Sequence, residues 1–171
     1  LNLNYNTVRV HIQPGARVGS AARIHIEPPN EFLQVEAPKL RTGKTNARWK
    51  LDVQRSVRKQ RDLVIIQGEV PQGASERVRY FNGSRPSMFV ASVLRKMLGR
   101  EGIKMLSKDT CSGSVPLNAA PLAEVESFPL REIVVLMNKF SNNFIAEALV
   151  RQLGKMALGH ASREEGLIVL Q

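Results

Sequence analysis

The composition of the chain excludes several classes of protein. Its 171 residues suffice for one ordinary domain or two small ones, and a hydrophobic content of 43% is too high for wholesale disorder. A single cysteine, Cys111, excludes an internal disulfide and a cysteine-based zinc cluster. The net charge of +10 favours a polyanionic partner such as nucleic acid, an anionic membrane face or an acidic wall polymer. No apolar run reaches the roughly 18 residues of a membrane span, and no motif requires a cofactor.

The first half of the chain alternates apolar and polar residues in the manner of half-buried strands. In TVRVHI, for example, Val8, Val10 and Ile12 share one face. Pro38 is expected to end the third strand, and a basic turn over residues 55–61 is expected to join the last two strands. This half is therefore predicted to form a β-rich accessory region, residues 1–80, with strands over residues 7–12, 22–27, 31–36, 48–54 and 62–70.

After Tyr80 the apolar residues repeat with the period of a helix. Ser84 is expected to cap a helix over residues 86–100, with Pro86 in its first turn. A turn-rich stretch follows and completes a connecting segment, residues 81–126. The last part, residues 127–171, is predicted to be helical, with helices over residues 130–140 and 144–153 and a final one opened by the capping box Ser162-Arg163-Glu164-Glu165. The predicted fold class is α+β.

Histidines and basic clusters are interpreted as solvent-facing. His11 and His25 are expected near each other across a hairpin, and His160 is far along the chain, but none has the spacing of a zinc site. Aromatic residues make up 5% of the chain and do not interleave with the charges, so no sequence-specific nucleic-acid binding is expected. The basic residues crowd two predicted turns, one with Arg55, Arg58, Lys59 and Arg61 and the other with Lys39, Arg41, Lys44 and Arg48.

Serine chemistry is a further possibility. Serine enzymes that react with penicillin carry the motifs S-x-x-K, S-x-N and K-T-G in this chain order. Ser56 to Lys59 fits the first in letters only, because the chemistry needs the two side chains one turn apart on a helix and this match falls in a predicted hairpin turn. Arg41-Thr42-Gly43 resembles the third motif but comes in the wrong order and is interpreted as a loop. Ser141-Asn142-Asn143 fits the second motif, but S-x-N is a weak pattern and helix capping is the favoured interpretation of the tripeptide by itself.

The surroundings of Ser141 favour the catalytic interpretation. Residues 129–154 (PLREIVVLMNKFSNNFIAEALVRQLG) resemble the S-x-N segment of class C low-molecular-mass penicillin-binding proteins, the D-alanyl-D-alanine carboxypeptidase/endopeptidase family. Asn142 stands where aspartate is common in that family. The stretches LNLNYNTVRVHIQPG, IIQGEVPQG and SMFVASVLRKMLGREGI resemble further family segments, so the likeness covers nearly the whole chain with its order kept.

The resemblance implies a fold and two site residues. The fold would be a β-rich accessory region followed by a helical portion of a penicillin-binding, serine transpeptidase-like domain. Ser141 would belong to a proton relay with the lysine of the nucleophile motif, which serves the leaving amine. Asn143 would bond the peptide carbonyl of the substrate and the same lysine. Because the chain lacks the true S-x-x-K and K-T-G motifs, we expect it to begin inside the family's insertion and to stop before K-T-G.

The resemblance also implies a function. The complete protein would be an exported, periplasmic serine-type D-Ala-D-Ala carboxypeptidase/endopeptidase that acts on peptidoglycan stem peptides through an acyl-enzyme and binds β-lactams, with its export signal upstream of Leu1. The 171-residue chain alone is expected to be inactive. The alternative is a basic, non-catalytic module that binds nucleic acid or an anionic wall polymer. The motifs S-x-x-K upstream and K-T-G downstream would separate the two.

Overall fold

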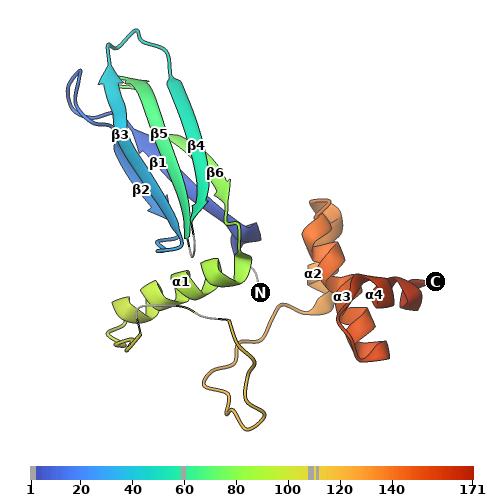
Figure 1. Cartoon of the computed structure of the whole chain (residues 1–171). Coiled ribbons are helices and arrows are strands. Elements are labelled where there is room, and N and C mark those ends of the chain that lie inside the picture. The colour runs from blue at the N-terminus through green and yellow to red at the C-terminus, as the bar shows by residue number, and fades with distance from the viewer. Residues whose placement is uncertain (1–2, 59–60, 108–109, 111) are drawn as a thin grey trace. The chain divides into compact units, whose positions relative to one another are not determined.

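The computed structural model describes residues 3–58, 61–107, 110 and 112–171 of the chain. The chain forms two compact units, a first unit, Leu1–Ser114, and a second unit, Val115–Gln171 (Figure 1). The first unit contains all the described strands and one long helix, and the second contains three helices. The predicted α+β class is therefore confirmed, whereas the predicted division at residues 80/81 and 126/127 stays a prediction.

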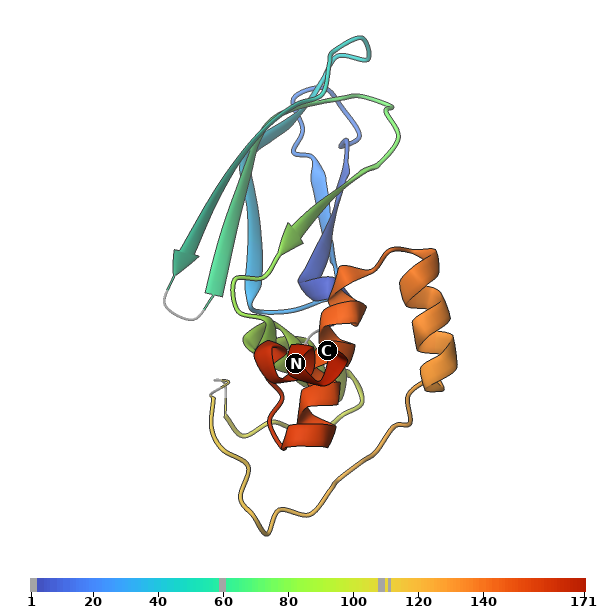
Figure 2. The same cartoon turned by 90° about the vertical axis from the view of Figure 1, so that its right-hand side faces the viewer.

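The first unit is built from two sheets of three strands each. One is fully antiparallel, with β1 (Thr7–Gln13) between β2 (Arg23–Glu27) and β6 (Arg77–Asn82). A short turn, Asn4–Asn6, precedes β1. In the other sheet β5 (Arg61–Pro71) lies between β3 (Leu33–Gly43), with which it pairs parallel, and β4 (Lys50–Arg58), with which it pairs antiparallel. Figure 2 shows the two sheets as separate layers.

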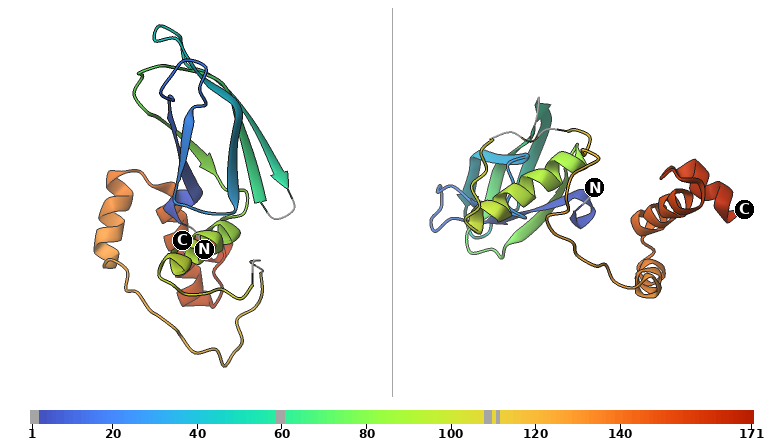
Figure 3. Two further views of the ribbon diagram at one scale, coloured as in Figure 1. Left: turned by 90° about the vertical axis from the view of Figure 1, so that its left-hand side faces the viewer. Right: turned by 90° about the horizontal axis from the view of Figure 1, so that it is seen from below.

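The core of the first unit lies between the sheets and against helix α1, Pro86–Arg100, which crosses one end of them (Figures 1 and 3). Apolar residues two apart on the strands and three or four apart on the helix point into this space. The repeat of apolar residues in the sequence therefore predicted which face of each element is buried. Its fully or nearly fully buried members are Val8, Val10, Ile12, Phe32, Leu33, Leu40, Val64, Ile66, Val70, Phe89 and Val93.

Several local expectations for the strands and the helix of the first unit were wrong. Pro38 does not end a strand, because β3 continues past it and the pairing register with β5 shifts between Glu36 and Lys39, an irregularity that accommodates a residue without an N–H. Ser84 does not cap α1, whose N-cap is Arg85 without a side-chain hydrogen bond. Residues 55–58, predicted as part of a turn, belong to β4, and Arg61 belongs to β5, while residues 59–60 of the predicted turn lie outside the described residues.

The second unit consists of α2 (Leu130–Lys139), α3 (Asn143–Leu158) and α4 (Arg163–Leu170), which confirms the predicted helices. Ser162 caps α4 as expected, because its side chain accepts from the N–H of Glu165. Helices α3 and α4 approach closely at two buried glycines, Gly154 and Gly166. None of the helices in the described part of the chain combines the length and the hydrophobicity that a membrane span requires.

Candidate active site

The tripeptide Ser141-Asn142-Asn143 forms the break between α2 and α3. The N–H of Asn142 donates to the carbonyl of Met137 at 2.9 Å, and the N–H of Ser141 donates to the carbonyl of Asn138 at 3.3 Å. These two bonds are the pair of a Schellman motif, in which the residue after the C-cap takes the left-handed conformation and is usually glycine. Ser141 occupies that place with φ 47°. In this conformation serine lowers the stability of the fold by about 1 kcal/mol relative to glycine. The chain therefore has a hydroxyl group at a position where glycine would be more stable.

Capping of α3 is the work of Asn142. Its Oδ1 accepts from the N–H of Ile145 at 3.1 Å, the bond expected of an N-cap residue. The capping and catalytic interpretations of S-x-N therefore fall on different residues. Ser141 and Asn143, on either side of the cap, both have exposed side chains, as a role toward a substrate requires.

Exposed apolar residues lie close to the break in the sequence. Leu136, Phe140 and Phe144 are all exposed, and the ammonium of Lys139 lies 5.4 Å from the centre of the Phe140 ring. Large exposed apolar patches mark surfaces that contact another part of a protein or a ligand. The S-x-N turn is therefore set in a surface suited to contact rather than to open solvent.

The other serine match is not a site. Ser56 is an exposed residue of β4, whose described part runs to Arg58, and Lys59 lies outside the described residues. The chemistry of S-x-x-K needs its serine on a helix, one turn before the lysine, and Ser56 lies on a strand. We therefore interpret the match of residues 56–59 to S-x-x-K as accidental.

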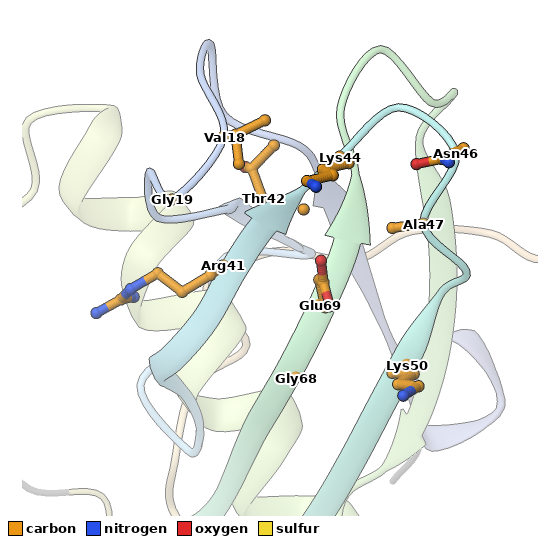
Figure 4. A pocket seen from close by; sticks show the side chains of 11 residues that line it. Val18, Gly19, Arg41, Thr42, Lys44, Asn46, Ala47, Lys50, Gly68 and Glu69 are labelled. Atoms are coloured by element: carbon orange, nitrogen blue, oxygen red, sulfur yellow. The ribbon is translucent and has the colours of Figure 1, made fainter.

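Arg41-Thr42-Gly43 lies at the end of β3, so the expectation of a loop was wrong. Thr42 is buried, and its hydroxyl accepts from the N–H of Gly15 at 2.7 Å, which gives it a structural role. Arg41 stands at the rim of an open groove of about 570 Å³ at the tip of the first unit (Figure 4), which we call the tip groove. It is lined by Val18, Gly19, Arg41, Thr42, Gly43, Lys44, Asn46, Ala47, Lys50, Gly68 and Glu69.

The histidines of β1 and β2 lie side by side, as predicted, but the expectation that both face solvent was wrong for His11, whose side chain is only 18% exposed. His11 and His25 are register partners with ring centres 5.7 Å apart. Sequence reasoning missed Glu76, whose Oε1 lies 2.6 Å from His11 Nδ1, and hydrogen bonding to His11 lowers the pKa of Glu76. Across the part of the chain that the structure describes, no three His, Cys, Asp or Glu residues are placed to hold a metal ion.

A buried carboxylate in the first unit also escaped the sequence analysis. Asp62 is fully buried and accepts from the N–H and the hydroxyl of Ser84, both at 2.7 Å, and from Nη2 of Arg55 at 2.8 Å. Burial raises the pKa of Asp62, but the hydrogen bonds from Ser84 and Arg55 together outweigh it, so the pKa lies below its ordinary value. Ser84 therefore hydrogen-bonds to Asp62 of β5 and does not cap α1, the helix that follows it.

Comparisons with known proteins agree with this architecture. The D-alanyl-D-alanine carboxypeptidase of Actinomadura sp. (strain R39) is 28% identical over 110 residues, which make up 63% of this chain and 20% of that protein. Two crystal structures of penicillin binding protein 4 from Haemophilus influenzae, one of them complexed with a β-lactam, match with TM-scores of 0.68 and 0.64 at 18% and 17% identity. At that identity the structural likeness shows the fold.

The matched proteins are much longer than this chain. The alignments with penicillin binding protein 4 cover 99% of this chain but only 38% and 37% of the two solved chains. The chain therefore spans a fifth of the curated relative and little more than a third of the solved structures. One family description matches all of residues 1–171, and the chain belongs to the D-Ala-D-Ala carboxypeptidase 3 (S13) family, as the resemblance around Ser141 predicted.

Proposed function

We propose that the chain is part of a serine-type D-Ala-D-Ala carboxypeptidase/endopeptidase that hydrolyses peptidoglycan stem peptides through an acyl-enzyme and that binds β-lactams when complete. Membership of the family supports the carboxypeptidase class. The observation that supports a catalytic role for this stretch is the left-handed backbone of Ser141, with φ 47°, at a position where glycine is energetically preferred. Strain of this kind concentrates at functional sites.

The chemistry assigns a task to each exposed residue of the turn. A hydroxyl donates and accepts at once, so Ser141 would receive a proton from the lysine of the nucleophile motif and pass it to the departing amine. The carboxamide of Asn143 would donate to the peptide carbonyl of the substrate and accept from the same lysine, which positions both. The nucleophilic serine and its lysine would be supplied by sequence other than residues 1–171. Asn142 would hold the turn through its cap on α3.

The proposed cellular setting follows from the substrate. Peptidoglycan lies outside the cytoplasmic membrane, so the complete protein would be exported to the periplasm under an upstream signal. Its partners would be stem peptides and β-lactams, and no sequence-specific nucleic acid.

The decisive experiment measures acylation of the full-length enzyme by labelled penicillin. We expect Ser141→Ala to slow acylation roughly 10²–10⁴-fold, the usual loss for a positioned proton-transfer group. Ser141→Gly removes the same hydroxyl while relaxing the backbone, so it should be as slow as the alanine variant and at least as stable as the wild type. Ser127→Ala, at an exposed serine before α2, is the matched control. Undiminished acylation in the glycine variant would refute the relay.

The isolated chain provides a second test. An unactivated hydroxyl is almost fully protonated near neutral pH and is a poor nucleophile. We therefore expect no covalent adduct when the 171-residue chain is incubated with penicillin, whereas the full-length protein should gain one penicilloyl group by intact-mass measurement. A stoichiometric adduct on Ser141 or Ser56 of the chain would contradict the assignment.

A binding module for polyanions is the second candidate, and the tip groove favours it. Arg41, Lys44 and Lys50 line this groove with a single carboxylate, Glu69. Arg41 and Lys50 are the register partners of Glu69 on the two neighbouring strands, so two cations flank one anion on the same face of the sheet. Salt-sensitive binding of an anionic polymer at this groove is compatible with the enzymatic role.

A further inference from the structure

The two tyrosines of the chain line one groove on the first unit. Tyr5 precedes β1 and Tyr80 lies on β6, and these residues are 60% and 66% exposed. The groove measures about 490 Å³, within the range of small-molecule sites. We call it the tyrosine groove; its lining consists of Asn4, Tyr5, Thr7, Arg9, Glu27 and Tyr80. It lies on the side of the β2-β1-β6 sheet that faces away from the core, since Val8 and Val10 of β1 point inward.

The floor of the tyrosine groove is a row of three side chains across three strands. Arg9 of β1 is the register partner of Tyr80 on β6 and of Glu27 on β2. Register partners in antiparallel strands project from the same face with their Cβ atoms about 5 Å apart. Arg9 Nη2 lies 3.0 Å from Glu27 Oε2, and both side chains remain about half exposed. An aromatic ring, a guanidinium and a carboxylate are thus presented side by side, and the two charges cancel.

The backbone at the end of the groove is strained. Asn4, Tyr5 and Asn6 have φ values of 48°, 55° and 58°, three successive left-handed residues of which none is glycine. Such residues persist only where the surrounding structure holds them. Here the side chain of Asn6 donates to the carbonyl of Gly83, and the N–H of Gly83 donates to the carbonyl of Asn6 at 3.1 Å. Two hydrogen bonds to the residue after β6 therefore fix the turn that presents Tyr5.

We propose that the tyrosine groove binds a saccharide chain. The negative face of an aromatic ring attracts the C–H groups on the apolar face of a sugar, while a tyrosine hydroxyl stays in water. The guanidinium of Arg9 and the carboxylate of Glu27 offer paired donors and acceptors to neighbouring sugar hydroxyls. Cancellation of their charges makes the groove suited to a neutral ligand, in contrast to the cationic tip groove. The choice of an N-acetylhexosamine glycan rests on the proposed function, because peptidoglycan strands are of that class.

The proposal is tested by calorimetric titration of the chain with chitotetraose, a neutral N-acetylglucosamine tetramer. Saturable binding with one site per chain is expected. Tyr5→Ala and Tyr80→Ala should each weaken it about tenfold or more, since each removes a stacking ring. Tyr80→Phe keeps the ring and should bind within about threefold of the wild type. Phe128→Ala is the matched control, because Phe128 is equally exposed, at 69%, but belongs to the second unit.

Two outcomes would overturn the proposal: no saturable binding, or equal binding by the wild type and both alanine variants with native circular dichroism spectra. Binding of maltotetraose as tight as that of chitotetraose would refute the choice of an N-acetylhexosamine glycan. If the alanine variants fail to fold, Arg9→Gln and Glu27→Gln, at two half-exposed positions, take their place and should weaken binding. The titration involves no β-lactam and no acylation. A negative titration would therefore not contradict the proposed role of Ser141. Likewise, undiminished acylation in the Ser141 variants would not contradict a saccharide site.

Discussion

The N–H of Asn142 donates to the carbonyl of Met137 at 2.9 Å, and this bond spans Ser141 and closes the end of α2. Asn142 then turns its side chain to the other helix and caps α3 at the N–H of Ile145. One residue therefore ends one helix through its backbone and begins the next through its carboxamide. These two hydrogen bonds of Asn142 restrict the backbone of Ser141, which therefore adopts the left-handed conformation with φ 47°.

Substitutions at this turn should separate stability from chemistry. Ser141→Gly should raise the free energy of unfolding by about 0.5–1 kcal/mol, because glycine adopts the left-handed region without a steric penalty. Asn142→Ala should lower it by about 1 kcal/mol through loss of the cap, and Asn142→Asp should keep it or raise it, since a carboxylate at a helix N-terminus also interacts with the dipole. Denaturant unfolding of the chain measures all three. A less stable glycine variant would contradict the strain at Ser141.

The buried carboxylate of Asp62 should govern part of the stability of the first unit. Asp62→Ala leaves the N–H and hydroxyl of Ser84 without their acceptor, and we expect a loss of about 2–4 kcal/mol in the free energy of unfolding. Asp52→Ala, at an exposed aspartate of the neighbouring strand β4, should stay within about 0.5 kcal/mol of the wild type. Equal losses in the two variants would show that the bonds of Asp62 contribute nothing.

The same group predicts a pH dependence. The pKa of Asp62 is lower in the folded protein than its ordinary value, so at acidic pH the unfolded state takes up the proton first. The contribution of Asp62 is thus fully present well above about pH 4 and is lost as the pH falls through the folded pKa. The difference in unfolding free energy between the wild type and Asp62→Ala should accordingly shrink in acid. A difference that grows with acidity would reverse the assigned sign.

Close packing of α3 and α4 should make Gly166 intolerant of a side chain. A Cβ at this position would lie 2.0 Å from the carbonyl oxygen of Val150, which is backbone and cannot move alone. Gly166→Ala should therefore lower the free energy of unfolding by about 1–3 kcal/mol. Gly99→Ala is the control, because a Cβ there meets nothing within 4 Å and alanine favours the helix by up to about 1 kcal/mol. Calorimetric melting of both variants checks the contrast.

Binding of DNA should be weak, blind to sequence and lost as salt rises, because it would depend on phosphate contacts from surface cations. The double variant Arg41→Gln, Lys44→Gln should reduce the slope of log affinity against log salt by about two. The same exchange at Lys139 and Lys155 in the second unit is the control. Fluorescence anisotropy over about 50–200 mM salt makes the measurement. Sequence-selective binding that survives the upper end of this range would favour the binding-module alternative.

Features with a short-range cause were predictable from the sequence. The alternation around Val10 and the apolar stripe of residues 86–100 identified a strand and a helix because burial on one face imposes a period. The tripeptide at Ser141 was found because two helical patterns met there. Features that depend on distant pairing were missed. The local sequence predicted Ser84 as a helix cap, but in the structure its N–H and its hydroxyl both donate to the buried carboxylate of Asp62. The tyrosine groove likewise exists only once Tyr80 is brought beside Arg9.

The order of strands in the second sheet has a consequence for how the chain acquires its fold. Strands β4 and β5 are neighbours in sequence and pair antiparallel, whereas β3 pairs parallel with β5 on the edge away from β4, so the connection over residues 44–49 crosses the end of β5. Contacts between neighbouring segments form quickly. Parallel pairing of distant segments forms slowly, because the chain between them must first lose conformational entropy. We expect a transition state in which β4 and β5 are paired and β3 is not. Until β3 arrives, one edge of β5 exposes unpaired backbone, and this is the stage at which the chain is most prone to aggregate.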